Sequence, residues 1–223
     1  ELLAKAKEAG WSIRCILNTH THADHTRGNE ALRDATGAPI FVHPSADPRT
    51  PGALPLDLSA RLRVGHCELQ VLDTPGHTDS HVCLLSESEQ PFLISGDTLF
   101  HAGAGNCHNG GNPEHLFKTF QNILWPMAHE TILLPGHDYR ARNLSFAADR
   151  EPGNQNIASL RDEAELESGA GGFTTLGLEH ASNPFFRLRN PTVIDALQAA
   201  FPDRELGSLK ARFLAMRELR NSW

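Results

Sequence analysis

The sequence predicts an α/β protein whose strands end at one shared edge, followed by a mainly helical region. Four apolar runs with the character of strands end in turns of Thr, Gly or Pro that carry His or Asp. Beyond Tyr139 the chain becomes rich in Arg, Ala, Glu and Leu at helical spacing. Packing alone does not explain the repeated strand-to-turn pattern, whereas strand ends that meet at one edge of a sandwich build a site. We therefore expect a metal-binding part at residues 1–140 and a helical, substrate-binding part at residues 141–223.

The composition narrows the class of protein and of partner. The 223 residues can bury a substantial core, and a hydrophobic content of 39% is ordinary for a soluble α/β protein. No apolar run has the length of a membrane span, so we expect neither a membrane partner nor a targeting leader. A net charge of −7 argues against nucleic acid as the main partner. The oligomeric state is not readable from these patterns.

The cysteines and histidines point to a compartment and to a chemistry. The four cysteines are widely spaced and form no Cys-x-x-Cys pair, which is typical of reduced thiols in a cytoplasmic protein. Thirteen histidines stand against a single tyrosine. This excess of imidazole indicates metal chemistry.

Local patterns predict the elements before residue 100 in order. Residues 1–9 have the composition of a helix that stops at Gly10. The apolar, β-branched run at 13–17 predicts a strand, and apolar spacing at 26–35 predicts a helix closed by Gly37. The remaining elements are a strand at 39–42, a Pro-rich loop at 47–58, a hairpin of 61–64 with 68–72, and a hairpin of 81–85 with 92–95.

The later elements are mostly helices. Asn112 followed by Pro113 predicts a capped helix that runs to about residue 124, because Asn favours the cap and Pro the first helical position. An apolar strand at 131–134 then ends in Pro135-Gly136-His137. Helices are expected at 141–148, 156–167, 192–200 and 204–220, with a flexible Gly-rich stretch at 168–172 and a loop at 174–186.

The segment 17–26 carries the densest chemistry. His20 and His22, two residues apart on extended backbone, project to the same side and can bind one ion together. Asp24 and His25 follow after the chain has turned, so they should face a second ion or another side of the first. A solvated His-rich loop is the alternative, but His-x-His-x-Asp-His at a strand end favours a metal site.

Seven side chains at strand ends supply nitrogen or oxygen donors. They are His20, His22, Asp24, His25, His77, Asp97 and His137. Seven such donors are too many for one tetrahedral ion and suit two ions that share one carboxylate. We therefore expect two divalent metal ions, with Zn²⁺ the first choice, while Fe and Mn also accept this ligand set.

The same positions resemble the metallo-β-lactamase-fold hydrolases, and within them glyoxalase II, the hydroxyacylglutathione hydrolases. The motifs that carry the resemblance, in family order, are Thr-Pro-Gly-His-Thr at 74–78, Ser-Gly-Asp-Thr-Leu-Phe at 95–100, Leu-Pro-Gly-His-Asp-Tyr-Arg-Ala-Arg-Asn-Leu at 134–144, and Asn-Pro-Phe-Phe-Arg-Leu-Arg at 183–189. The resemblance covers nearly the whole chain and implies an αββα sandwich with a C-terminal helical region. The family opens with a few strands before its first helix, and this chain begins at that helix.

The resemblance also implies roles for the ligands. His20, His22 and His77 would hold one metal, and Asp24, His25 and His137 the other. Asp97 would bridge the two ions, so that the carboxylates Asp24 and Asp97 stand at the catalytic centre. Two metals about 3.5–4 Å apart can activate a bridging hydroxide for attack on a carbonyl, and a thioester suits this route because its thiolate leaves readily.

One departure from the family concerns the substrate. After residues 102–105 the family usually carries a Lys and then a Tyr that contact glutathione, whereas this chain has Asn106 and His108. Arg187 and Arg189 are the candidates for binding a substrate carboxylate, as the resemblance suggests. The expected partner is a small-molecule thioester of the glutathione-derived type, such as S-lactoylglutathione.

Two other functions fit part of this evidence. Persulfide dioxygenases share the fold and use one iron held by a subset of the same ligands, but their usual form lacks so long a helical C-terminal region. A non-catalytic binding protein on a degenerate hydrolase fold is the third reading. The complete ligand set argues against it, because intact ligands imply retained chemistry.

Overall fold

The fold places two sheets of strands between helices. A computed structural model describes residues 1–46, 51–166 and 172–223. In this part of the chain the first sheet has the order β1-β2-β3, with β1 at Ile16–Leu17, β2 at Ile40–Val42 and β3 at Leu54–Pro55. All its neighbours are parallel. The predicted strand at 39–42 is confirmed.

The second sheet has the order β10-β7-β6-β5-β4. Its strands are β4 (Arg61–Val64), β5 (Cys67–Asp73), β6 (Val82–Ser86), β7 (Phe92–Gly96) and β10 (Ile132–Pro135). The neighbours from β4 to β7 are antiparallel, and β10 runs parallel to β7. Both predicted hairpins are therefore confirmed, and the apolar run at 131–134 is a strand at the end of this sheet.

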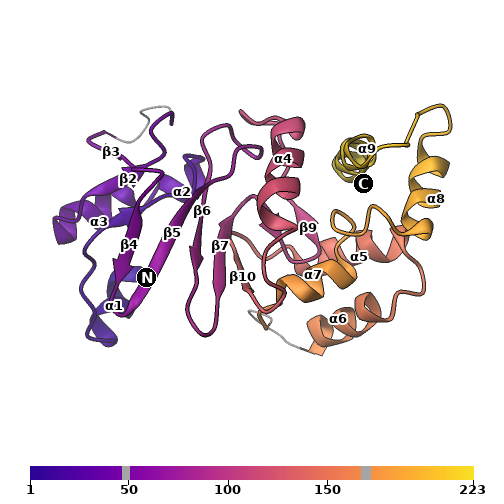
Figure 1. The fold of residues 1–223 in the computed structure, drawn as a ribbon. Coiled ribbons are helices and arrows are strands. Elements are labelled where there is room, and N and C mark those ends of the chain that lie inside the picture. The colour runs from indigo at the N-terminus through magenta and orange to yellow at the C-terminus, as the bar shows by residue number, and fades with distance from the viewer. Residues whose placement is uncertain (47–50, 167–171) are drawn as a thin grey trace.

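Helices flank the sheets, as Figure 1 shows, with α3 beside the first sheet and α4 to α9 beyond the second. Strands β8 (Leu99–Phe100) and β9 (Gly103–Ala104) form a separate antiparallel pair. The helical segments are α1 (Leu2–Glu8), α2 (Ala23–Thr26), α3 (Asn29–Thr36), α4 (Pro113–Thr119), the π-helix η1 (Phe120–Leu124), α5 (Arg140–Arg150), α6 (Gln155–Leu166), α7 (Leu176–Ser182), α8 (Pro191–Ala200) and α9 (Leu209–Ser222). The expected αββα sandwich with a helical C-terminal region is confirmed.

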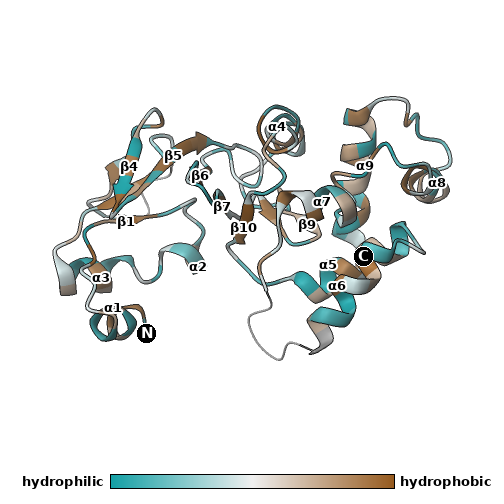
Figure 2. Cartoon of the chain, turned by 60° about the horizontal axis from the view of Figure 1, so that its bottom comes forward, coloured by the Kyte–Doolittle hydropathy of each residue, from teal (hydrophilic) through white to brown (hydrophobic). Residues whose placement is uncertain are grey.

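The largest hydrophobic core lies between the second sheet and the C-terminal helices. Leu93 of β7 and Leu133 of β10 are fully buried in it together with Phe120, Phe185 and Phe213. In Figure 2, β10 has the brown colour of hydrophobic residues, whereas α2 at the site has the teal colour of hydrophilic residues. The strand that packs in the core is therefore apolar, and the helix at the site is polar. Because this core draws on both sides of residue 140, the helical region is packed onto the sheet. The division into parts at 1–140 and 141–223 stays a prediction.

Helix caps follow the predicted chemistry. The Asn112 side chain accepts hydrogen bonds from the backbone N–H groups of Glu114 and His115, which fixes the start of α4 as expected. Ser208 in the same way accepts from Ala211 N–H at the start of α9. Helix α9 therefore begins later than the predicted residue 204, at a residue whose side chain can replace a missing backbone partner.

Three other predicted elements differ from the structure. The strand at 13–17 is reduced to β1, because only Ile16 and Leu17 find partners on β2. The loop at 174–186 was wrong, since it contains α7, whose first turn is capped by the Thr175 side chain and whose Leu176 and Glu179 are buried. The loop at 47–58 contains β3. Parts of the predicted segments at 47–58, 156–167 and 168–172 lie outside the described residues.

Candidate metal centre

Four strand ends converge on one point of the sandwich. The turn after β1 carries His20, the turn after β5 carries His77, and Asp97 follows directly on the last residue of β7. His137 lies two residues beyond the end of β10. His22, Asp24 and His25 come from the N-cap and first turns of α2, which continues from the first of these turns. The seven predicted donors are thereby brought together.

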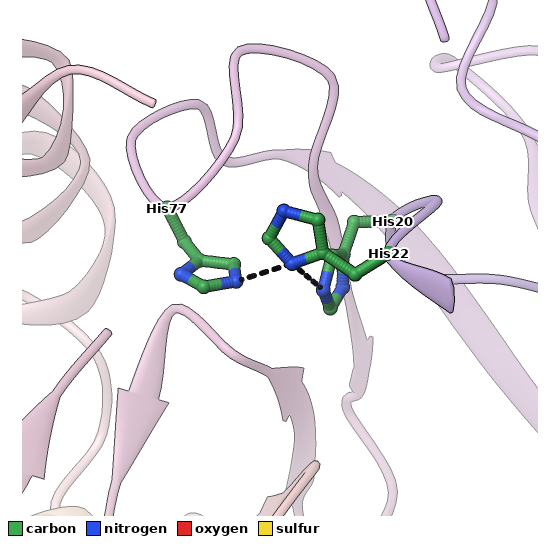
Figure 3. Close-up of side chains that lie close together, drawn as sticks. All are labelled: His20, His22 and His77. Atoms are coloured by element: carbon green, nitrogen blue, oxygen red, sulfur yellow. Dashed lines mark hydrogen bonds between the residues drawn. The ribbon is translucent and has the colours of Figure 1, made fainter. Parts of the chain in front are cut away.

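His20, His22 and His77 form the first group of ligand atoms. The Nδ1 atom of His22 lies 3.0 Å from His20 Nε2 and 3.1 Å from His77 Nε2. Figure 3 shows the three rings turned so that these nitrogens face one point. His20 and His77 are buried, and His22 is half-buried.

Asp24, His25 and His137 form the second group. His137 Nε2 lies 3.1 Å from His25 Nε2 and 3.2 Å from Asp24 Oδ2. His25 Nε2 lies 3.8 Å from the same carboxylate oxygen. Asp24 is exposed, and His25 and His137 are half-buried, as His22 is.

Asp97 lies between the two groups. Its Oδ1 is 3.3 Å from His25 Nε2, while its Oδ2 is 3.6 Å from His77 Nε2 and 3.4 Å from His137 Nε2. The residue is only 6% exposed, and Oδ1 makes no hydrogen bond with the described protein. A buried carboxylate oxygen without a hydrogen-bond donor is costly unless a cation occupies the space in front of it.

The donor set fits two divalent ions. The ligand atoms of a tetrahedral ion with bonds of about 2.0–2.1 Å to imidazole lie about 3.3 Å apart. The separations of 3.0 and 3.1 Å in the first group approach this value. All seven donors are nitrogen or oxygen, which suits Zn²⁺ and also Fe or Mn.

Backbone carbonyls orient two of the imidazoles. His77 donates from Nδ1 to the carbonyl of Asn106 at 2.7 Å, and His22 donates from Nε2 to the carbonyl of Asn109 at 2.9 Å. Each bond fixes the tautomer in which the other ring nitrogen carries the lone pair for a metal. Thr19 Oγ1 lies 3.2 Å from Nδ1 of His20 and serves the third ring in the same way.

Burial sets the charge of these rings before a metal binds. Burial, with smaller contributions from neighbouring imidazoles, lowers the pKa of His20 far below its usual range, and burial likewise lowers the pKa of His77. For His25 burial acts the same way, but the facing Asp97 carboxylate more than offsets it and raises the pKa. The buried rings of His20 and His77 are therefore neutral at pH 7, the state in which imidazole binds a metal.

His81 is a residue of the site that the sequence analysis did not identify. Its Nε2 accepts the backbone N–H of Asp97 at 3.1 Å, and its Nδ1 lies 3.0 Å from the hydroxyls of Thr74 and Thr98. The ring is fully buried and stacks on His20 with 5.1 Å between centroids. The signal that could have found it is the spacing His77-x-x-x-His81 in one turn.

Three polar side chains next to the ligands in sequence make no hydrogen bond to a ligand imidazole among the described residues. Asp79 pairs with His115 at 2.9 Å, and Asp138 accepts the backbone N–H of Arg140 as a loop cap. The Thr78 hydroxyl has no hydrogen-bond partner within the described residues.

Two glycines let the backbone approach Asp97 closely. A Cβ atom on Gly105 would lie 1.9 Å from the Asp97 carbonyl oxygen and 3.0 Å from His77 Nδ1. A Cβ atom on Gly136 would lie 2.4 Å from Asp97 Oδ1. Glycine is required at both positions because any side chain would occupy the space of the ligands.

Two adjoining spaces open over the donors. A central cavity of about 640 Å³ is lined by His22, Asp24, His77, Asp97 and His137. A side pocket of about 280 Å³ shares Asn106 and Tyr139 with it and is lined further by His108, Arg142 and Arg220. The two spaces can therefore hold the two ends of one substrate.

The structure brings only part of the predicted substrate residues to this place. Asn106 and His108 line the side pocket, and their role in substrate binding stays a prediction. Arg187 instead forms a two-pronged ion pair with the carboxylate of Glu151 and donates to the His180 carbonyl. Arg189 is exposed, and neither arginine lines the central cavity or the side pocket. Arg142 and Arg220, which do, carried no signal that set them apart from the other arginines.

No helix among the described residues combines the length and apolar character needed to cross a membrane. The comparisons with known proteins agree with the fold. Residues 1–137 match the model of the metallo-beta-lactamase superfamily, and residues 138–223 match that of the hydroxyacylglutathione hydrolase C-terminus. A hydroxyacylglutathione hydrolase of Nitrosococcus oceani is 46% identical over 228 residues, which cover 100% of this chain and 86% of that protein.

Solved structures extend the comparison. ETHE1 from Myxococcus xanthus superposes with a TM-score of 0.62 at 24% identity, covering 97% of this chain and 82% of its own, which shows the shared fold. TTHA1623 in a di-iron-bound form has a TM-score of 0.59 at 29% identity, covering 82% of this chain and 83% of its own. With both family models matched in order and a relative at this identity over the whole chain, the protein belongs to the hydroxyacylglutathione hydrolases of the metallo-beta-lactamase superfamily.

Proposed function

We propose that the protein hydrolyses a thioester of the hydroxyacylglutathione type, such as S-lactoylglutathione, with two divalent metal ions held by the seven donors. The observation that carries the proposal is the position of Asp97, buried between two groups of three ligands with its oxygens directed to both. A relative of 46% identity bears the name hydroxyacylglutathione hydrolase, which supports this substrate class.

The metal ions in the proposal are Zn²⁺ first, with iron as the alternative. Five imidazoles and two carboxylates are too many donors for one tetrahedral ion, whereas two ions can divide them, with three donors for each and Asp97 shared. TTHA1623, which shares the fold, is described in a di-iron-bound form. When bound, the pair supplies Lewis acidity toward the thioester carbonyl and lowers the pKa of water towards neutrality.

The residues of the centre prepare it for this chemistry. Asp24 and Asp97 are the two carboxylates that balance the charge of the ions, and Asp97 is shared between them in the proposal. The carbonyls of Asn106 and Asn109 hold His77 and His22 with the ligand nitrogens directed inward. The reaction consumes the thioester and one water and releases a carboxylic acid and a thiol.

Tyr139 links the cavity to the side pocket. Its ring stacks on His137 with 5.2 Å between centroids and lines both spaces. Burial, and then the charges of Asp97 and Asp24, raise the pKa of its hydroxyl. The phenol therefore stays protonated near neutral pH, so it can donate a hydrogen bond to the substrate.

The side pocket is suited to the thiol carrier. Arg142, Arg217 and Arg220 line it, and no aspartate or glutamate is among its described lining residues. Three guanidinium groups without a carboxylate among them favour an anionic ligand, because charge-assisted hydrogen bonds to carboxylates are among the stronger polar contacts. A glutathione moiety, which carries carboxylates, fits this chemistry with its acyl group at the metals.

A cytoplasmic place of action belongs to the same proposal. The four cysteines are free, and none is paired with another. Free thiols suit a reducing compartment, where a glutathione-derived thioester would also be found.

The experiment is metal analysis of purified protein together with two activity assays, one with S-lactoylglutathione and one with glutathione persulfide. We expect two metal ions per chain, hydrolysis of S-lactoylglutathione, and loss of both in Asp97→Ala. Oxygen consumption with glutathione persulfide and one iron per chain would instead identify a persulfide dioxygenase. Two bound metals without turnover of either substrate would leave a binding protein and overturn the proposal.

A further inference from the structure

The loop that joins β8 and β9 to residue 106 is held by the C-terminal helices through its backbone. Asn143 of α5 donates to the His101 carbonyl at 3.0 Å, and Asn183, directly after α7, donates to the Gly103 carbonyl at 3.1 Å. The Glu179 carboxylate accepts the Ala102 N–H at 2.9 Å. These bonds fasten successive peptide groups, so the path of the loop depends on helices far along the chain.

Arg217 of α9 makes the last of these contacts, closest to the metal centre. Its Nη1 donates to the carbonyls of Ala104 at 2.6 Å and Gly105 at 2.9 Å. The residue is 5% exposed, its Nε donates to Asn221, and its guanidinium lies over the Phe185 ring. Burial lowers the pKa of Arg217 to about 10, so the group is charged at neutral pH and its hydrogen bonds are charge-assisted.

The carbonyls bound by Arg217 adjoin the one that orients a ligand. The peptide after Gly105 presents the Asn106 carbonyl, which accepts the His77 Nδ1–H at 2.7 Å. Gly105 itself packs against the Asp97 carbonyl and His77 Nδ1 so closely that a Cβ would not fit. Any movement of this segment therefore moves the hydrogen-bond partner of His77 and the wall behind Asp97.

We infer that Arg217 is a positioning residue of the metal centre, which fixes the 104–106 segment so that His77 keeps the tautomer and orientation for binding a metal through Nε2. The inference rests on the proposed two-metal function. It assigns to the helical region a second task besides lining the side pocket, namely the support of one ligand of the first metal.

The same helix offers a matched control. Arg212 of α9 also clamps two carbonyls, donating to Leu206 at 2.6 Å and Leu188 at 3.1 Å. Neither of these carbonyls adjoins a ligand. Arg212→Met therefore reports what the loss of an arginine clamp does to the fold, and Arg217→Met reports that effect together with any effect on the centre.

The test measures metal affinity by chelator competition in the parent, Arg217→Met, Arg217→Lys and Arg212→Met, with thermal unfolding beside it. Outer partners of ligands commonly contribute about 10–100-fold to metal affinity. We expect a loss of that size for one of the two ions in Arg217→Met and a smaller loss in Arg217→Lys, which keeps one cationic donor. Arg212→Met should bind both ions as the parent does, whatever its melting temperature.

The spectrum of the Co²⁺-loaded protein gives a second readout, because it reports ligand geometry independently of turnover. A changed spectrum in Arg217→Met and a parental one in Arg212→Met support the inference. Parental metal affinity and spectrum in Arg217→Met, or equal losses in both methionine variants, overturn it. A raised KM alone would mean that Arg217 only contacts substrate. If the parent protein itself binds fewer than two ions, the proposed two-metal function is wrong. That outcome is distinguishable from a failure of the Arg217 inference, in which the parent binds two ions and Arg217→Met binds them equally well.

Discussion

His81 accepts the backbone N–H of Asp97 at 3.1 Å while its ring stacks on His20. One fully buried imidazole thus contacts two of the seven donors. It also bonds the Thr74 and Thr98 hydroxyls, so its orientation is fixed from the opposite edge. His81 is a support of the centre rather than a ligand, since it belongs to none of the ligand groups among the described residues.

The first prediction concerns this support. His81→Phe keeps a ring in the space but leaves the Asp97 N–H and two hydroxyls without their partner. A buried group that loses its hydrogen bond costs about 1–3 kcal/mol, so we expect a loss of that order in the free energy of unfolding together with weaker metal binding. Denaturant unfolding and metal analysis measure both. His66→Phe in the exposed β4–β5 turn is the control and should change neither; a His81→Phe protein with parental stability would contradict the prediction.

The second prediction concerns the metal-free protein and pH. The pKa values of His20, His77 and His81 are lowered, chiefly by burial, whereas that of His25 is raised by Asp97. Below the ordinary His pKa of about 6.5, these three imidazoles bind protons in the unfolded chain but stay neutral in the folded protein. The free energy of unfolding therefore falls as the pH decreases. His25 acts in the opposite sense but is a single group. Unfolding of the chelator-treated protein at pH 7.5 and pH 5 should show lower stability at pH 5, and equal stability at both would be the contrary result.

The third prediction concerns the shared carboxylate. Asp97→Asn keeps the shape of the side chain but removes its charge from both proposed ions. We expect loss of metal and of turnover together, by about 10²-fold or more in kcat/KM, because electrostatic contributions at such centres reach several kcal/mol. Metal content and steady-state kinetics are the measurements. Asp138→Asn, an exposed cap of the Arg140 N–H, is the control and should retain both metals.

The fourth prediction concerns the close approach at Gly105. Gly105→Ala places a methyl group 1.9 Å from the Asp97 carbonyl oxygen, which is backbone and cannot rotate away. The segment must shift, so we expect lower metal affinity and a lower melting temperature. Gly28→Ala, where a Cβ meets nothing within 4 Å, is the control. A Gly105→Ala protein that binds two ions with parental affinity would show that the segment has more room than its contacts indicate.

The strand ends and the candidate ligands were predictable because their signals are local. Each apolar run that ends in a His- or Asp-bearing turn predicts a strand that ends at the edge of the sandwich. The four runs are β1, β5, β7 and β10. The meeting of the seven donors then follows from the packing of the two sheets, with β1 in the first and β5, β7 and β10 in the second. Helix α7 was missed because Gly177 and the Asn183-Pro184 pair interrupt the apolar spacing. Its buried Glu179 accepts hydrogen bonds from the nearby Thr174 and Asn183 and also from the Ala102 N–H, 77 residues earlier in the chain.

The substrate side was not predictable, because it depends on contacts between distant residues. Arg187 has the residue type of a carboxylate clamp, but its partner is Glu151, 36 residues earlier in the chain. Arg220 and Asn143 are 77 residues apart, and their hydrogen bond joins α9 to α5 at the side pocket. No spacing in the sequence distinguishes these two arginines, since the distinction arises only when the helices pack.

The last prediction separates the two sets of arginines by kinetics. Arg220 lines the side pocket, where burial and the nearby Arg142 lower its pKa, so an anionic group placed there would find a poorly solvated cation. Arg220→Gln removes that charge. A hydrogen bond to a charged group contributes about 1.5–3 kcal/mol, which corresponds to a rise of about one to two decades in KM for S-lactoylglutathione. We expect kcat to change little, because the side pocket binds the carrier and not the reacting carbonyl. Arg189→Gln, at an exposed position outside both spaces, is the control and should have the parental KM. A raised KM in Arg189→Gln with a parental KM in Arg220→Gln would contradict the prediction. It would mean that the segment of Arg187 and Arg189 binds the substrate carboxylate, as the sequence first suggested.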